Sequence, residues 1–216
     1  VPLSTHLPKL LNAIDSLRPD SHKVPRDQRE KRATGSALQV ALGLVADLGI
    51  NTRFVGLIGG PCTVGVGKVV NLPLKNTIRS YVDIFEGNEN TENIATATAF
   101  YDGLAELLVK GQHTLDLWAY GLDQFGLMEM KSLVSGSGGM LAMHEEFNHF
   151  IFKTSFSAFT TDEENILPFP VACTLTIRLS KELKINGILG LGKSLKDNTQ
   201  KSAAEMEIGE GLTQSW

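Results

Sequence analysis

A glycine-rich stretch, Leu57–Val70 (LIGGPCTVGVGKVV), has the residue types of a phosphate-binding loop. Such loops present backbone N–H groups to an anion, and the single lysine here would add positive charge. The spacing fits neither standard motif, since a Walker loop needs glycine at Cys62 and a hydroxyl at Val69, and the dinucleotide fingerprint needs glycine at Val70. We interpret the stretch as a turn-rich loop after a buried strand, and a nucleotide-binding α/β enzyme that uses Gly59–Gly67 remains the alternative hypothesis.

Other patterns that could do chemistry are also incomplete. The segment HEEFNH, His144–His149, resembles a zinc helix, but its imidazoles are five residues apart instead of four and would diverge by roughly 140° around a helix. Cys62 and Cys173 form neither a ligand pair nor a disulfide framework, which is typical of a reducing compartment. No G-x-S-x-G elbow occurs, and Ser135–Gly139 is predicted to be a flexible turn. We therefore expect no catalytic residue and no cofactor or metal site in this chain.

Composition points to an ordinary globular protein. The chain has 216 residues, 42% of them hydrophobic and 20% charged, with a formal net charge of −4. These values do not favour disorder or nucleic-acid binding, and no stretch approaches the roughly 20 apolar residues of a membrane span. The first residues match no secretion signal, so we expect a cytosolic protein whose sequence begins within a longer polypeptide.

A basic segment lies between two predicted helices. Residues 18–32 (RPDSHKVPRDQREKR) contain two prolines, no apolar periodicity and a surplus of positive charge. These features predict an exposed connection. We hypothesise that four of its residues face an acidic partner or anionic lipid: Arg26, Arg29, Lys31 and Arg32.

Hydrophobic periodicity predicts alternating helices and strands before residue 168. The expected elements are helices at Pro8–Leu17 and Thr34–Leu48, a strand at Arg53–Ile58, a helix at Asn93–Lys110, a strand at His113–Tyr120, a helix at Leu127–Leu133, a strand at Met140–Met143 and a helix at Phe147–Phe159. This order predicts a doubly wound parallel sheet with helices on both faces. Three strands make a thin sheet, so we expect further strands upstream of Val1.

The same patterns predict several local details. Thr5 and Thr34 are candidate helix caps. The strand Arg53–Ile58 is expected to be buried on both faces. The apolar stripes of the predicted helices place Leu48, Leu107 and Ile151, among other side chains, in the core.

The pattern changes near Pro168. From Val171 to Ser180, apolar and polar residues alternate, which is typical of a half-buried strand, and an apolar run follows at Ile185–Leu191. We predict two domains, an α/β domain over residues 1–167 and the start of a β-type domain over 168–216.

Ordered sequence words resemble a known family. RATGSALQVALGLV resembles the T-G-x-A-L start of a helix in the von Willebrand factor A fold. GGPCTVGVGKVV, IRSYVDI, LDQFGLMEMK, GGMLAM, FNHFIFKTSFSAFT, TLTIRLSKELKINGILG and EIGEGLTQSW are similar, in this order, to the trunk domain and following β-sandwich of the Sec23 family. The resemblance extends from about Arg32 to Trp216. It implies an incomplete von Willebrand A-like trunk followed by part of a β-sandwich.

The Sec23 family is the GTPase-activating subunit of the inner COPII vesicle coat. The resemblance implies a scaffold in transport from the endoplasmic reticulum to the Golgi, which pairs with the cargo-adaptor subunit, engages a Sar-type small GTPase and lies in the cytoplasm, peripheral to membranes at exit sites. The family's activating arginine lies in a later gelsolin-like region and its zinc finger lies upstream. Neither has a counterpart in this chain, so we expect no enzyme activity from it alone.

Some von Willebrand A domains bind a divalent cation through oxygens from three loops. Thr34 matches the second loop only, and the third position falls in Gly59–Pro61, which offers no side-chain oxygen. The resemblance therefore implies protein–protein scaffolding instead of metal-dependent adhesion.

Overall fold

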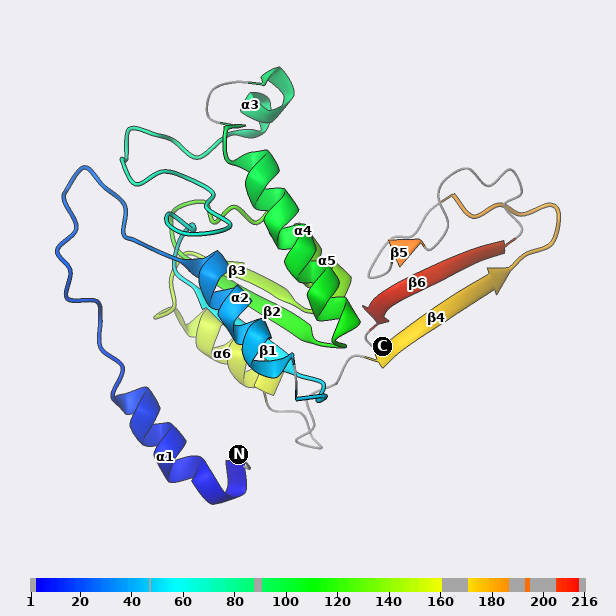
Figure 1. The fold of residues 1–216 in the computed structure, drawn as a ribbon, viewed down its shortest axis with the longest axis horizontal. Helices are drawn as coiled ribbons and strands as arrows, with labels where there is room; N and C mark the ends of the chain where they lie inside the picture. Colours follow the sequence, from blue (N-terminus) through cyan, green and yellow to red (C-terminus); the bar gives the residue numbers. More distant parts are fainter. Residues whose placement is uncertain are drawn as a thin grey trace.

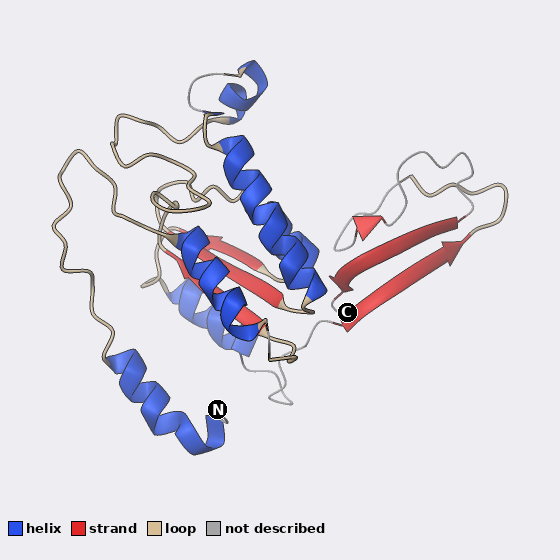
Figure 2. Ribbon diagram, viewed as in Figure 1, coloured by secondary structure: helices blue, strands red, loops and turns tan. Residues whose placement is uncertain are grey.

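The computed structural model describes residues 3–46, 48–87, 91–160, 171–186, 193–194 and 205–213. It has mixed α/β architecture, with a parallel sheet in the order β1-β2-β3 and an antiparallel sheet in the order β4-β6-β5 (Figures 1 and 2). The predicted fold class is confirmed, because an open parallel sheet with covering helices matches a von Willebrand A-like trunk. The elements around the parallel sheet are α1 (Leu3–Asp15), α2 (Thr34–Val45), β1 (Arg53–Ile58), α3 (Tyr81–Glu86), α4 (Ile94–Lys110), β2 (Thr114–Tyr120), α5 (Lys131–Ser137), β3 (Leu141–His144) and α6 (Phe150–Thr160).

Strand β2 is the centre of the parallel sheet, and all its residues are buried. It pairs with β1 in the register Phe54↔Leu115 and with β3 in the register Leu117↔Leu141. Because side chains alternate along a strand, one face of β2 presents the core residues Leu115, Leu117 and Ala119. Helices α2, α4 and α5 contribute the other side of this core, including Leu42, Tyr101, Leu104, Leu108 and Leu133.

The opposite face of the sheet packs against α6 through aromatic rings. Trp118 is fully buried, and its ring centroid lies 5.8 Å from that of Phe152, 5.2 Å from that of Phe156 and 5.4 Å from that of Phe159, all edge to face. Edge-to-face pairs of this kind add stabilisation beyond the area they bury. The two faces of β2 are therefore covered by different helices, as a doubly wound sheet requires.

A buried ion pair lies beside this aromatic cluster. Arg53 Nε donates to Asp116 Oδ2 at 2.6 Å, and the Arg53 guanidinium also lies 4.8 Å from the ring centroid of Phe159. The other carboxylate oxygen of Asp116 accepts from the Met140 backbone N–H at 2.8 Å. One carboxylate of β2 therefore connects β1 with the residue that directly precedes β3.

The bounds predicted for β1 are confirmed, but the prediction that both of its faces are buried was wrong. Val55 is 42% exposed and Leu57 is 57% exposed. Both side chains lie on the α6 face of the sheet. Among the described strands β1 is at the edge of this sheet, and α6 packs mainly against β2, so this face of β1 is uncovered at Val55 and Leu57.

Several helix details also differ from expectation. Helix α1 begins at Leu3, so Thr5 lies inside it, and α2 has Ala33 at its N-cap, so Thr34 is its first residue. Helix α2 ends at Val45, and Leu48 is 59% exposed because the helical stripe no longer continues to it. Leu107 and Ile151 are exposed as well. The missed helix α3 is short and has a capping box formed by Ser80 and Asp83.

Helix α5 lies four residues later than predicted and includes Ser135 to Ser137, which were expected to form a flexible turn. The turn follows at Gly138, whose φ is 71°. At Gly139 an added Cβ would lie 1.9 Å from the Leu115 carbonyl oxygen. Only glycine permits the backbone to approach β2 this closely before β3 begins.

The second sheet contains β4 (Val171–Arg178), β5 (Lys193–Ser194) and β6 (Glu205–Thr213). Strands β4 and β6 are antiparallel, from Val171↔Thr213 to Arg178↔Glu205. The strand predicted from Val171 is therefore confirmed. The predicted domain boundary at residues 167–168 and most of the run Ile185–Leu191 lie outside the described residues.

His113 makes stability depend on pH. It is 5% exposed, its Nδ1 accepts from the Thr52 backbone N–H at 3.2 Å, and burial lowers its pKa. Below about pH 6.5 the unfolded chain protonates this residue while the folded protein resists, so stability falls with falling pH by at most about 1.4 kcal/mol per unit. Denaturant unfolding of wild type and His113→Gln across this range should show a shallower slope for the variant. An identical slope would contradict this assignment, and exposed His22 offers the control His22→Gln.

Candidate partner-binding surface

The carboxyl ends of the parallel strands form one surface with the basic connection. The loop after β1 begins at Gly59, the loop after β2 begins at Gly121, and Glu145 follows β3. Residues 24–33 cross this edge and form backbone hydrogen bonds with residues 63–74. The carboxyl edge of an open parallel sheet is where α/β proteins commonly bind ligands. Sequence reasoning treated the basic segment and the glycine loop separately, whereas the structure brings them together.

Arg29 is held inside this surface. Its side chain is only 9% exposed. Its guanidinium donates to three backbone carbonyls, those of Asn71 at 3.3 Å, Pro73 at 3.1 Å and Asn76 at 2.8 Å. It also pairs with Asp123 at 3.3 Å. Arg29 therefore ties the connection to the loops after β1 and β2, and little of its charge is available to a partner.

Arg32 is also engaged within the chain. Its guanidinium pairs with Glu30 and lies against Gly60, where an added Cβ would be 2.8 Å from its Nη1. The Arg32 carbonyl accepts from the backbone N–H groups of Thr63 and Val64. The Arg32 guanidinium thus lies beside Gly59–Pro61, the stretch that corresponds to the third metal-binding loop of von Willebrand A domains. Its positive charge there would repel a bound cation.

Arg26 and Lys31 are the two exposed members of the predicted cluster. Residues 7 to 27 are all exposed, so Arg26 continues a solvent-facing segment. The structure therefore separates the four predicted residues into two with internal contacts and two with accessible charge. Contact with an acidic partner or lipid stays a prediction for all four.

The glycine loop does not form a phosphate cradle. The N–H groups of Val69 and Val70 donate to the Cys62 carbonyl. Lys68 Nζ donates to Asn71 Oδ1 at 2.8 Å, and the Gly67 carbonyl accepts from the buried Tyr101 hydroxyl at 2.8 Å. Within Gly59–Gly67 the N–H groups of Thr63 and Val64 donate to the Arg32 carbonyl, so these amides and Lys68 have partners within the chain, and the nucleotide-binding alternative finds no support. The loop uses its glycines, two of which have positive φ, to turn and pack against α4.

A second buried ion pair was missed by sequence reasoning. Arg79 pairs with Glu129, whose side chain is 1% exposed, and its Nη1 also donates to Gln124 Oε1 at 3.4 Å. These residues are 50 positions apart, so no local pattern announces the contact. The pair fixes the segment before α3 against the segment before α5.

The described residues contain neither a metal-ligand cluster nor a membrane-spanning helix. Among residues 3–46, 48–87, 91–160 and the described parts of the second sheet, no group of three or more His, Cys, Asp or Glu side chains is placed to hold a metal. His144 and His149 stack with ring centroids 4.6 Å apart, without a third ligand of these types. Within the same residues no helix is long and apolar enough to cross a bilayer.

Comparison with known proteins shows which protein family this chain matches. The profile of the Sec23/Sec24 trunk domain matches residues 1–160. A curated relative, protein transport protein SEC23 F of Arabidopsis thaliana, is 38% identical over 205 residues, which cover 94% of this chain and 26% of that protein. The chain thus spans about a quarter of the length of this relative. The matched range contains β1, β2 and β3 and the surface that the carboxyl ends of these strands form with the basic connection.

Proposed function

Because this chain belongs to the Sec23/Sec24 trunk family, we propose that it is a scaffold of a COPII-type vesicle coat in transport from the endoplasmic reticulum to the Golgi. The family match over residues 1–160 carries this proposal. The trunk pairs with the cargo-adaptor subunit, and the assembly engages a Sar-type GTPase at the cytoplasmic face of exit-site membranes. The chain contributes shape and contact area instead of a reacting group.

Exposed apolar side chains support a role in assembly. Helix α2 exposes Val40 and Leu44, α3 exposes Tyr81 and Phe85, and α1 exposes four apolar side chains, Leu7, Leu10, Leu11 and Ile14. Large exposed apolar areas are typical of protein–protein contact sites. In Figure 1 both α1 and α3 project away from the parallel sheet, which places their side chains within reach of neighbouring molecules.

A reconstituted pull-down tests the proposal. The 216-residue chain is incubated with the purified adaptor subunit, and separately with liposomes that carry a Sar-type GTPase loaded with GTP or GDP. We expect capture by the adaptor and flotation with the GTP-loaded membranes only. Failure of both assays would reject the scaffold role. A GTPase assay in the same mixture should show no stimulation by this chain alone, because we propose that it contributes contact area and no activating residue.

Charge reversal tests the exposed basic residues. Each cationic side chain near an anionic membrane contributes about 1 kcal/mol. Arg26→Glu with Lys31→Glu should therefore weaken flotation on anionic liposomes by roughly tenfold or more, while unfolding stability stays unchanged because both residues are exposed. Lys153→Glu on α6, also exposed, is the control. Equal flotation of the double variant and wild type, with unchanged adaptor capture, would show that this surface contacts neither.

A further inference from the structure

We propose that the open edge of β3 and the pocket beside it bind an extended peptide segment that carries a bulky apolar side chain and, two positions away, a lysine or arginine. This inference goes beyond the scaffold role, because it assigns a linear-peptide site within the domain. It rests on three features of the described residues: an unpaired strand edge, an apolar pocket and an acidic rim.

The strand edge offers main-chain hydrogen-bonding groups. The carbonyl of Met140 accepts from the Leu117 N–H in β2, and the carbonyl of His144 accepts from the Gly121 N–H directly after β2. Because backbone groups alternate in direction along a strand, those of Leu141 and Met143 point away from β2. In the sheet order given by the described residues, β3 pairs with β2 alone. An edge of this kind is a template for an added strand.

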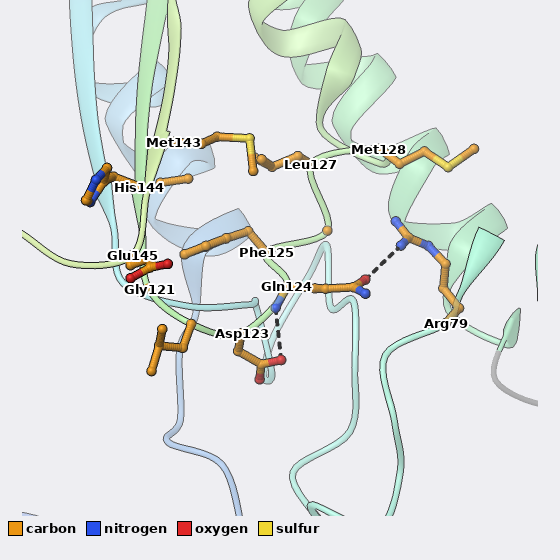
Figure 3. A pocket seen from close by; sticks show the side chains of 13 residues that line it. Arg79, Gly121, Asp123, Gln124, Phe125, Leu127, Met128, Met143, His144 and Glu145 are labelled. Carbon is orange, nitrogen blue, oxygen red and sulfur yellow. Dashed lines mark hydrogen bonds between the residues drawn. The ribbon is translucent and has the colours of Figure 1, made fainter.

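The pocket lies at the carboxyl ends of β2 and β3 and has a volume of about 530 Å³ (Figure 3). This volume falls within the range of typical ligand sites, about 300 to 1,000 Å³. A smaller pocket of about 190 Å³ shares Leu127 with it and continues along Leu141 toward α5. The apolar lining of the larger pocket includes Ala119, Phe125, Leu127, Met128 and Met143.

Met128 and Met143 make the lining of the larger pocket adaptable, so it can accept apolar side chains of different shapes. Met143 is 61% exposed and Met128 is 51% exposed, so both are accessible. Methionine side chains are flexible and polarisable, and they adapt to ligands of different shape. Met143 belongs to β3 itself, so a peptide paired with this edge would place a side chain next to it.

The rim determines the charge of the ligand. In Figure 3 the side chains of Asp123 and Glu145 lie on the opposite side of Phe125 from Met143 and Leu127. Arg79 also lines the pocket, but Glu129 neutralises it. Asp123 shares its charge with Arg29 and its side chain is still 49% exposed, while Glu145 is exposed. The remaining charge is negative, which favours a cationic side chain.

The geometry of a strand links these features. Side chains two positions apart point to the same face, so an apolar residue beside Met143 places the second residue along near Glu145. Main-chain pairing would supply affinity, and the pocket and rim would supply specificity.

The test uses the whole chain and fluorescence anisotropy with labelled peptides in which leucine and threonine alternate and lysine stands near one end. Glu145→Lys should weaken binding about tenfold and should improve binding of the matching peptide with glutamate in place of lysine. Met143→Glu should abolish binding, and Glu106→Lys, an exposed change on α4, should leave it unchanged. Because Met143 and Glu145 are exposed, circular dichroism should show all variants folded.

Two further measurements test the pairing mode. Peptides methylated on the pairing backbone nitrogens should bind at least about tenfold more weakly. Hydrogen exchange should show new protection at the amides of Leu141 and Met143, and little change at Ala142. Equal binding by wild type and Glu145→Lys, or by methylated and plain peptides, would overturn the proposal. The proposal would also be overturned if the chain self-associates, if Met143→Glu abolishes that self-association, and if added peptide does not compete with it. A second copy of the chain would then occupy the edge. None of these outcomes depends on adaptor or membrane binding, so the scaffold role is tested separately.

Discussion

Asp116→Ala should lower the free energy of unfolding by about 3–5 kcal/mol, the usual cost of removing one partner from a buried ion pair. Asp116 is fully buried, and its carboxylate binds both the Arg53 guanidinium and the Met140 N–H. The alanine leaves a buried positive charge and a backbone donor without this acceptor. Urea unfolding followed by circular dichroism measures the change.

Two companions make this prediction sharp. Asp102→Ala removes an exposed carboxylate from α4 and should change stability by less than about 0.5 kcal/mol. The double variant Arg53→Met with Asp116→Leu removes both charges, and we expect it to be more stable than Asp116→Ala alone. If Asp116→Ala costs no more than Asp102→Ala, the carboxylate does not join the strands as the structure indicates.

Trp118→Ala should destabilise the protein by about 3–5 kcal/mol and loosen α6 in particular. Trp118 is fully buried and contacts the rings of Phe152, Phe156 and Phe159, so its loss leaves a cavity between β2 and the helix. Hydrogen exchange should increase in α6 more than in α4, which packs on the other face of the sheet.

Trp118→Phe is the matched variant. It keeps an aromatic ring and removes the indole N–H, which is buried and has no hydrogen-bond partner among the residues that the structure describes. We therefore expect a cost of only about 1–2 kcal/mol. Equal losses for alanine and phenylalanine would mean that the size of the aromatic side chain does not hold α6 in place.

Regular elements with clear ends were predictable from the sequence. The bounds of β1 match because Gly59, Gly60 and Pro61 follow an apolar run directly. Helix α4 matches within one residue because its buried residues follow the helical period and Gly111 marks its end. Local signals determine these elements, so one sequence contains enough information to place them.

Helix α5 shows where local signals fail. Ser135, Gly136 and Ser137 look like a turn, yet they form the last turn of the helix. Their small size permits close packing: Ser137 is fully buried and its Oγ accepts from the Leu115 N–H at 3.1 Å, while an added Cβ at Gly136 would touch Val109 and Ala105. Tertiary contacts thus override a preference for turns, and a sequence taken alone contains no record of them.

The candidate surface was only partly predictable for a related reason. The basic composition of residues 18–32 indicates an exposed segment, which holds for Arg26 and Lys31. Nothing in that segment distinguishes Arg29, because its carbonyl partners come from residues 71–76. The pocket beside β3 also combines residues from separate loops, so neither its apolar lining nor its acidic rim appears as a motif.

Helix α1 has a kinetic consequence. It carries exposed Leu7, Leu10, Leu11 and Ile14 on the far side of an exposed connection that ends where Arg29 is anchored. An extended chain covers up to about 3.3 Å per residue, so residues 16–28 are long enough to place this helix up to about 40 Å from Arg29. Any molecule already docked on the domain would meet the leucine stripe at an effective concentration in the millimolar range. A weak first encounter can thereby become a long-lived one, without any change in the sheet.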